Sequence, residues 1–472
     1  MRTDERASST MIRAAGLLPV ALVLALASIA CRPDVAHEVG ADLADEVAAD
    51  VVDEVGAGWP GWRGPARDGR SSEAALQEQW PEGGPPLLWR TTGLGSGFSS
   101  LAVADGRIFT LGDVGEEQHV VAVSSDDGSI LWRTVIGPSW SEADLYPGSR
   151  STPSVAGDTV YALGTEGDLV ALAGDSGVVR WRRSLAEMGG FVAMASAGVN
   201  WRFTESPLVD GDRVVVTPGA PDAAMVALDR HSGEVLWRAS IPDLGDLGSD
   251  GAAYSSIVIS HGAGVKQYVQ LMGRGVVGVR AADGRFLWGY NRIANDVANI
   301  PTPLVEGDHV FTSTGYDTGA ALLELRPGGD GPDGALVEAH EVYFLEASTF
   351  QNHHGGMVLH DGFVYTGTGH NRGFPLGLEL RTGTVAWGPV RNEGRGSAAL
   401  AYADGRLYFR YQDGLVVLVE ATPEAYRERG SFRIPEVRDP SWSHPVVSGG
   451  RLYLREQDRL YVYDLRRGND EA

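Results

Sequence analysis

The hexapeptide Asp127-Gly128-Ser129-Ile130-Leu131-Trp132 is a short motif that returns along most of this chain. Variants of it occupy residues 175–181, 231–237, 282–288 and 381–387. Each copy is a polar turn followed by an apolar segment that ends on tryptophan. A motif that recurs at such intervals indicates one structural unit built several times, so its period is the first guide to the fold.

The repeating unit is predicted to contain four strands, of which the tryptophan strand is the outermost. The tryptophans at positions 89, 132, 181, 237, 288 and 387 are separated by 43, 49, 56, 51 and 99 residues, and the last interval corresponds to two units with one tryptophan missing. The 63 glycines among 472 residues suit many short strands joined by tight turns. Four-stranded units at this spacing favour a β-propeller, in which radial stacking protects the strand edges.

Eight units can be counted along the chain. They begin near Ser99, Ser151, Glu205, Ser255, Pro301, Gly355, Ala398 and Ser443. The last unit has three strands before the chain ends, and the strand-like segment 86–91 stands alone in front of the first unit. We therefore predict an all-β, eight-bladed β-propeller of four-stranded blades, whose last blade is closed by this N-terminal strand.

The N-terminal region has the pattern of an export signal. Residues 14–30 form an apolar run after Arg13 that is too short for a stable membrane span. Residues 28–31 resemble a bacterial lipoprotein cleavage box, in which Cys31 becomes the lipidated first residue; ordinary cleavage after Ala30 is the alternative. We predict a signal peptide (1–30), an acidic tether (31–58), a propeller (59–467) and a short tail (468–472), with an extracytoplasmic, membrane-anchored location on the periplasmic or outer-membrane side.

Composition excludes several classes of function. The formal charge of -23 opposes binding to nucleic acid, because a phosphate backbone is itself negative. Lys266 is the only lysine, which argues against phosphate-loop and Schiff-base chemistry. Cys31 is the only cysteine, so an intramolecular disulfide and a cysteine-rich metal site are excluded. We expect a monomer that contacts the membrane through its lipid anchor.

The repeat resembles a known family. The turn-plus-tryptophan element, preceded by segments such as 158–163 and 169–172, is similar to the repeat of pyrroloquinoline-quinone-type (PQQ-type, or quinoprotein-like) eight-bladed propellers, and the resemblance covers residues 59–467. Segments 62–65 and 350–356 also resemble secreted bacterial PQQ-binding-like propellers. The resemblance implies that each tryptophan docks between neighbouring blades. The family includes quinoprotein alcohol dehydrogenases and a lipoprotein scaffold for outer-membrane protein assembly.

One face of the ring is predicted to carry the binding surface. The long links between units (137–150, 187–203, 242–254 and 291–300) should lie on the same face as the hairpins between second and third strands. Alignment of the inner strands gives two registers. The first contains Ser100, Thr152, Ser206, Ser256, Thr302, Gly356, Ala399 and His444, and the second contains Phe98, Arg150, Thr204, Tyr254, Ile300, His354, Ser397 and Trp442. Either these side chains ring a small-molecule funnel, or the hydroxyls satisfy backbone groups at strand starts.

Two functions follow as expectations. The first is an extracytoplasmic, lipid-anchored propeller that binds a small molecule or an envelope protein on its loop-rich face, where Arg410 and Arg455 are candidate partner contacts. The candidate ligand-binding residues are Arg150, Trp201, Glu205, Tyr254, Asn299, His354, His370, Trp442 and His444. His353 and His354 suggest a metal site, but because adjacent strand residues point to opposite faces, at most one of them is expected to join a common site.

The alternative function is a PQQ-dependent dehydrogenase that oxidises an alcohol or a sugar in the same funnel. As the resemblance implies, it would need PQQ with calcium, with Glu205 and Asn299 near the cation and Asp296 as the catalytic base. The alcohol dehydrogenases of the family hold a vicinal cysteine disulfide against the cofactor, and this chain departs from that pattern because it has a single cysteine.

Overall fold

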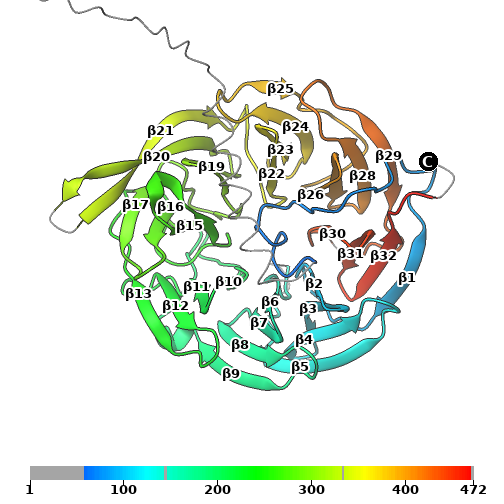
Figure 1. Ribbon diagram of the computed structural model, residues 1–472, viewed down its shortest axis with the longest axis horizontal. Coiled ribbons are helices and arrows are strands. Elements are labelled where there is room, and N and C mark those ends of the chain that lie inside the picture. Colours follow the sequence, from blue (N-terminus) through cyan, green and yellow to red (C-terminus); the bar gives the residue numbers. More distant parts are fainter. Residues whose placement is uncertain (1–57, 143–145, 332–333, 439, 469–472) are drawn as a thin grey trace, which may run out of the picture. The chain divides into compact units, whose positions relative to one another are not determined.

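The computed structural model describes residues 58–142, 146–331, 334–438 and 440–468, which form a ring of eight four-stranded antiparallel sheets (Figure 1). The predicted all-β, eight-bladed propeller is therefore confirmed. We number the blades from the first complete unit, so that each blade runs from its inner strand at the axis to its outer strand at the rim. The predicted signal peptide, lipidation at Cys31 and almost all of the acidic tether lie outside the described residues.

The first four blades are β2–β5, β6–β9, β10–β13 and β14–β17. Their strands are β2 Ala102–Ala104, β3 Arg107–Val114, β4 Glu117–Ser124, β5 Ile130–Pro138, β6 Ser154–Ala156, β7 Thr159–Leu163, β8 Asp168–Ala173, β9 Val179–Ser184, β10 Leu208–Asp210, β11 Arg213–Val216, β12 Met225–Asp229, β13 Val235–Ala239, β14 Val258–Ser260, β15 Gln267–Met272, β16 Gly275–Arg280 and β17 Phe286–Tyr290. Two short 3-10 turns, Ala186–Met188 and Gly262–Gly264, lie in the connections.

Blades 5 to 8 are β18–β21, β22–β25, β26–β29, and β30–β32 with β1. Their strands are β18 Leu304–Glu306, β19 His309–Thr314, β20 Gly319–Gly331, β21 Gly334–Glu346, β22 Met357–His360, β23 Phe363–Thr368, β24 Phe374–Glu379, β25 Val385–Trp387, β26 Ala398–Ala403, β27 Arg406–Tyr411, β28 Leu415–Glu420, β29 Glu428–Arg433, β30 Val446–Ser448, β31 Arg451–Glu456, β32 Arg459–Asp464 and β1 Leu87–Thr92. The hairpin of β20 and β21 reaches beyond the rim of the ring (Figure 1).

Blade 8 is closed by the first strand of the chain. β1 pairs antiparallel with β32, in a register that places Trp89 opposite Val462 and Thr92 opposite Arg459. The expected closure by an N-terminal strand is thus confirmed. Because the first and last strands share one sheet, the ring has no free break between its two ends.

Most tryptophans of the repeat join neighbouring blades, whereas the indole N–H of Trp288 donates to Gln267 Oε1 in its own blade. The indole N–H of Trp132 donates to the carbonyl of Gly174 in the next blade at 3.1 Å, and Trp181 and Trp387 make equivalent bonds to the carbonyls of Arg230 (2.9 Å) and Thr422 (2.7 Å). In blade 5, where the tryptophan is missing, the hydroxyl of Tyr343 donates to the carbonyl of Leu380 at 2.6 Å. Tyrosine therefore replaces tryptophan there with the same bond across the blade boundary.

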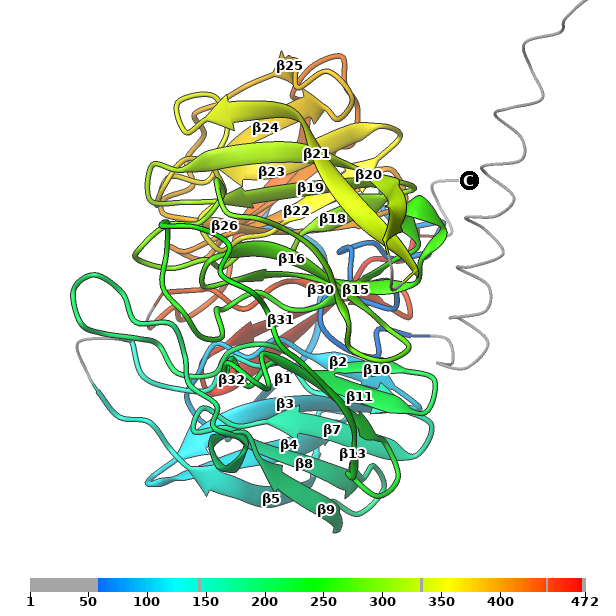
Figure 2. The same cartoon turned by 90° about the vertical axis from the view of Figure 1, so that its left-hand side faces the viewer.

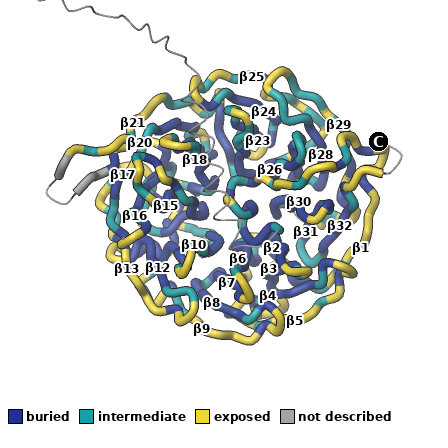
Figure 3. The backbone as a smooth tube through the Cα atoms, viewed as in Figure 1, coloured by how far each residue is buried: buried dark blue, intermediate teal, exposed yellow. Residues whose placement is uncertain are grey.

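The core lies between the blades. Middle strands such as β7 and β15 are buried along their length, whereas outer strands such as β5 alternate between exposed and partly buried residues (Figure 3). This burial pattern matches the strand composition, since Val, Leu and Ala dominate the middle strands. None of the helices found among the described residues has the length and apolar character that crossing a membrane requires.

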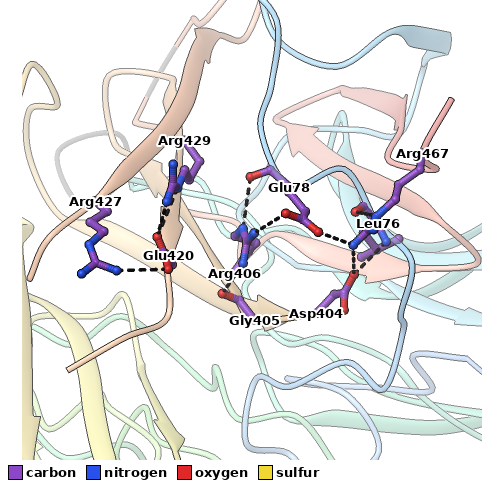
Figure 4. Close-up of polar contacts among 9 residues, drawn as sticks. All are labelled: Leu76, Glu78, Asp404, Gly405, Arg406, Glu420, Arg427, Arg429 and Arg467. Atoms are coloured by element: carbon purple, nitrogen blue, oxygen red, sulfur yellow. Dashed lines mark hydrogen bonds and ion pairs between the residues drawn. The ribbon is translucent and has the colours of Figure 1, made fainter. Parts of the chain in front are cut away.

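Residues 58–86, which we call the N-terminal brace, cross the ring before they lead into β1. The amide of Trp59 donates to the carbonyl of Val103 in blade 1 at 2.9 Å, and the amide of Ser71 donates to that of Tyr402 in blade 7 at 2.8 Å. Farther along, Glu78 lies between Arg406 and Arg467, which brings the brace onto blades 7 and 8 (Figure 4). Because Arg67 also donates to the carbonyl of Pro207, next to blade 3, the brace links blades on both sides of the axis.

Candidate functional site

A cavity of about 210 Å³ opens on the loop-rich face, at the centre of the ring. Aromatic and histidine side chains dominate its lining, and most of them come from the links between blades. Its main side chains are Trp62, Arg63, Phe98, Tyr146, Arg150, Trp201, Tyr254, Ile300, Tyr316, His353, His354, Trp442 and His444. In Figure 2 the long links that follow blades 2, 3 and 4 extend from one side of the layer of strands. The contrast between a loop-rich and a plain face, expected from the sequence, is present in the structure.

Six of the nine residues named as candidate ligand contacts line this cavity. They are Arg150, Trp201, Tyr254, His354, Trp442 and His444. His370 lies beside it, with its ring centroid 4.3 Å from that of His353 and 4.5 Å from that of Tyr316. The structure therefore places most of the predicted ligand-binding residues around one cavity. Their role in binding a ligand stays a prediction.

The expectation that strand alternation separates His353 from His354 is wrong. Both rings line the cavity, and their centroids are 4.2 Å apart. The two residues lie in an irregular segment before β22 begins at Met357, so strand alternation does not apply to them. His353 also contacts the hydroxyls of Ser397 (2.8 Å) and Tyr316 (3.2 Å).

The hydroxyl side chains of the first register, at the starts of the inner strands, join one blade to the next. The amide of Thr152 donates to Ser206 Oγ at 2.9 Å, and the amide of Ser206 donates to Ser256 Oγ at 3.0 Å. The amides of Ser100 and Ser256 bond to Thr152 Oγ1 (3.2 Å) and Thr302 Oγ1 (3.4 Å) in the same way. The hydroxyls satisfy backbone amides around the axis, as the structural interpretation expects, and Ser256 and Thr302 also line the cavity.

The histidines of the cavity are electrically neutral at ordinary pH. Burial lowers the pKa of His354 and of His444 to about 3, and burial also lowers the pKa of His353. Arg150 carries positive charge, because burial lowers the pKa of its guanidinium only to about 10. Arg150 donates to the carbonyls of Gly148 (3.0 Å) and Tyr146, and its guanidinium lies 5.2 Å from the centroid of the Phe98 ring.

The N-terminal brace supplies the floor of the cavity, which sequence reasoning did not identify. The indole N–H of Trp62 donates to Thr302 Oγ1 at 3.0 Å, and the Trp62 ring lies 4.5 Å from that of His444. Arg63 is only 3% exposed and also lines the cavity. The segment stands outside the repeat, so the alignment of inner strands could not place it. The signal available was the cluster of Trp59, Trp62 and Arg63 in a stretch with no repeat partner.

The three residues assigned to calcium and to catalysis lie elsewhere. Glu205 is buried and accepts hydrogen bonds from the amide of Thr217 and from Gln270 Nε2 (3.0 Å). Asn299 Nδ2 donates to the carbonyl of Gly273 at 3.0 Å. Asn299 and Asp296 line a separate small pocket. Their assigned roles as cation ligands and catalytic base stay predictions.

The residues around the main cavity do not fit a quinone held by calcium. Calcium takes oxygen ligands, chiefly carboxylates, and a dehydrogenase needs a base within reach of its substrate. No Asp or Glu side chain is among the described residues that line the cavity. No group of three or more His, Cys, Asp or Glu side chains suited to a metal ion occurs in the part of the chain that the structure covers.

Arg410 and Arg455, expected as contacts for a partner, are fully buried, so that expectation is wrong. Arg410 forms an ion pair with Glu456 at 2.9 Å and donates to the carbonyl of Ser443 at 2.6 Å. Arg455 reaches from blade 8 into blade 1, where it donates to Thr110 Oγ1 at 2.6 Å. Both side chains bind neighbouring blades instead of solvent, because they point along the blade interfaces.

The family of the chain is decided by a match over most of the propeller. The family model described as outer membrane protein assembly factor BamB matches residues 86–198 and 189–389. The chain belongs to this family. A BamB protein of Salmonella typhimurium is 31% identical over 148 residues, which are 30% of this chain and 32% of the relative. The chain thus matches about a third of the length of the curated relatives.

Solved structures agree with the fold. The crystal structure of BamB from Moraxella catarrhalis superposes with a TM-score of 0.53 at 14% identity, over 81% of this chain and 98% of that one. The quinohemoprotein alcohol dehydrogenase from Comamonas testosteroni gives a TM-score of 0.58 at 13% identity, over 92% of this chain and 84% of that one. At these identities the likeness concerns the propeller fold alone, which the BamB family shares with dehydrogenases.

Proposed function

We propose that this BamB-family protein is an extracytoplasmic, lipid-anchored binding protein that holds its partner on the loop-rich face of the propeller. The apolar run 14–30 followed by Cys31 supports export and anchoring. The name of its matched relatives, outer membrane protein assembly factor, supports a location in the cell envelope and a protein as the partner.

A single observation carries the proposal: three neighbouring links form one platform that exposes apolar side chains. The amide of Ala193 donates to the carbonyl of Ala252 at 2.7 Å, and that of Leu247 donates to Asn291 Oδ1 at 3.2 Å, so links 187–203, 242–254 and 291–300 are tied together. On these links Phe191, Met194 and Leu247 are 39%, 48% and 47% exposed. Exposed apolar side chains on an ordered platform are typical of protein-binding surfaces.

Photo-crosslinking in cells tests this surface. A photo-crosslinking amino acid is placed in turn at Phe191, Met194 and Leu247 in the full chain, and at Val178 as the control. Val178 is 63% exposed and apolar as well, but it lies in the turn before β9, at the opposite ends of the strands. We expect the same envelope protein to be captured from the three link positions and not from Val178. Equal capture from Val178 would contradict the proposed face.

The anchor is tested separately. Replacement of Cys31 by alanine should abolish metabolic labelling with a fatty acid and move the protein from the membrane fraction to the soluble fraction, because the acyl chain provides the membrane affinity. A Cys31→Ala variant that is still found in the membrane fraction would show that another segment holds the protein there.

The second candidate function is the PQQ-dependent dehydrogenase. The gathering of Arg150, Trp201, Tyr254 and Trp442 around one cavity favours it, whereas the absence of any Asp or Glu side chain from the described residues of the lining opposes it. The test adds PQQ with calcium to the purified chain and measures cofactor absorbance and dye reduction over alcohols and sugars. We expect neither signal. Substrate-dependent dye reduction would establish the dehydrogenase instead.

A further inference from the structure

The floor of the cavity contains a positive charge with an unused hydrogen-bond donor. Arg63 Nη2 donates to the carbonyls of Asp68 (2.8 Å) and Met357, but Arg63 Nη1 has no hydrogen-bond partner among the described residues. A buried N–H without an acceptor is unfavourable, and a ligand that supplies an acceptor removes that cost. The guanidinium stays charged at neutral pH, since burial lowers its pKa only to about 10.

Gly356 leaves room for this side chain. Its backbone has a φ of 74°, and a Cβ built on it would overlap Arg63 Nη1 and lie 3.0 Å from Cε1 of His444. Arg63 and His444 are therefore neighbours beside Gly356, and all three residues line the cavity. Any larger residue at position 356 would push the guanidinium away from its present place.

His444 offers the opposite chemistry. Its Nε2 lies 3.2 Å from the carbonyl oxygen of His354, so this nitrogen carries the proton. In the neutral ring Nδ1 is then an acceptor, and it has no hydrogen-bond partner among the described residues. Arg63 and His444 thus give the floor one charged donor and one neutral acceptor, both without a partner among the described residues.

Aromatic rings flank this pair. Trp62 packs against His444, with 4.5 Å between ring centroids, and Trp442 packs against His354 at 4.8 Å. Two arginines, Arg63 and Arg150, line the cavity, and the described lining residues include no Asp or Glu side chain. Although the whole chain is strongly negative, the cavity itself therefore favours an anion with a flat apolar body.

We propose that the cavity binds a small aromatic carboxylate that also bears a hydroxyl or amino group. The carboxylate accepts from Arg63 Nη1, the hydroxyl or amino group donates to His444 Nδ1, and the ring packs against the tryptophans. This inference rests on the proposed function in one respect, namely that the loop-rich face is the binding face, and it adds the class of ligand.

Binding of hydroxybenzoic acids to the purified full chain tests the proposal. The probe is 3-hydroxybenzoate, followed by isothermal titration calorimetry and by quenching of tryptophan fluorescence, since Trp62, Trp201 and Trp442 line the cavity. Two controls separate the contacts: 3-hydroxybenzamide lacks the negative charge, and benzoate lacks the hydroxyl. We expect the hydroxybenzoate to bind at least about tenfold more tightly than the amide, as for loss of a charge-assisted hydrogen bond.

Variants of two buried arginines of the brace provide a matched comparison. Arg67 is 7% exposed and donates to the carbonyls of Pro207 (2.9 Å) and Ser206 (2.7 Å), yet it does not line the cavity. We expect Arg63→Gln to weaken 3-hydroxybenzoate about tenfold or more and to leave the amide unchanged. Arg67→Gln should retain the wild-type preference for the acid. Gly356→Ala should resemble Arg63→Gln, because it displaces the guanidinium without removing its charge.

Each outcome decides the proposal. Circular dichroism first shows which variants are folded, and Gly356→Ala serves if Arg63→Gln is not. Equal binding of acid and amide, or equal losses in Arg63→Gln and Arg67→Gln, would overturn the carboxylate site while the cavity remained a ligand site. Binding of none of the three compounds at up to about 10 mM would overturn it too. Crosslinking from Phe191, Met194 and Leu247 tests the proposed function independently of all these results.

Discussion

Trp237 in β13 donates its indole N–H to the carbonyl oxygen of Ala281, in the next blade, at 3.2 Å. The same ring covers Gly284, where a Cβ would lie 2.5 Å from the indole carbon Cε3. One side chain thus contributes both a hydrogen bond and a packed face to the boundary between blades 3 and 4. Variants that remove the ring or only the N–H can therefore separate the contributions of packing and of the hydrogen bond to the free energy of unfolding.

Replacement of Trp237 by alanine should lower the free energy of unfolding by about 3 kcal/mol, because it removes the packed ring and the bond together. Trp237→Phe keeps an apolar ring and loses the N–H, so its loss should be only about 1 kcal/mol. Urea denaturation of the two variants provides the measurement. A Trp237→Ala protein as stable as wild type would disprove the docking role.

The glycine beneath the indole should also be sensitive. Gly284→Ala places a methyl group against Trp237 and a side chain at a φ of 77°, whereas Gly211→Ala meets a φ of 54° with nothing within 4 Å of the new Cβ. Both variants carry backbone strain of about 1 kcal/mol. Gly284→Ala should be the less stable by a further 1 kcal/mol or more, by analogy with overpacked cores. Equal melting temperatures would show that the ring can move aside.

The buried pair of Arg410 and Glu456 should be far more costly to break than an exposed pair. Glu456→Gln leaves the guanidinium of Arg410 buried without its counter-charge, and we expect a loss of about 3 to 5 kcal/mol. Glu306→Gln is the control, because Glu306 pairs with Arg381 at the surface, where the two side chains are 36% and 51% exposed. That change should cost less than about 1 kcal/mol. Similar losses in the two variants would contradict this assignment.

Glu205 should make the fold less stable as the pH rises. Burial raises the pKa of its carboxyl group from the ordinary 4.5 to about 7. The unfolded chain loses this proton at the lower pH and the folded chain keeps it until about pH 7, so stability is lost progressively between these values. The loss amounts to about 3 kcal/mol. The difference in unfolding free energy between wild type and Glu205→Gln, measured from pH 4 to 8, should follow this change, and a difference independent of pH would contradict it.

The sequence predicted the fold well because the propeller is periodic. The tryptophan spacing indicated the repeat period, the starts of the units indicated eight blades, and the lone strand before the first repeat predicted the closure that the pairing of Trp89 with Val462 confirms. The sequence did not indicate what replaces the missing tryptophan, and the structure places Tyr343 in that role. A repeated pattern is recognisable because each copy meets the same neighbours.

The site was less accessible to the same reasoning. Alignment of the inner strands placed Arg150, Tyr254 and Trp442 around the cavity, but the floor of Trp62 and Arg63 comes from a segment without copies. Arg410 and Arg455 were misassigned because a hairpin position does not reveal which way a long side chain points. Their burial is determined by carbonyls and carboxylates of neighbouring blades that come together only in the closed ring.

The pairing of β1 with β32 also determines when the ring can close during folding. A ring that needs its first strand to complete its last sheet cannot close until the final residues of the chain are available. Under the proposed export, the ring would therefore close only after its last strand has crossed the membrane. The same pairing that stabilises the folded propeller thus makes closure of the ring wait for its last strand.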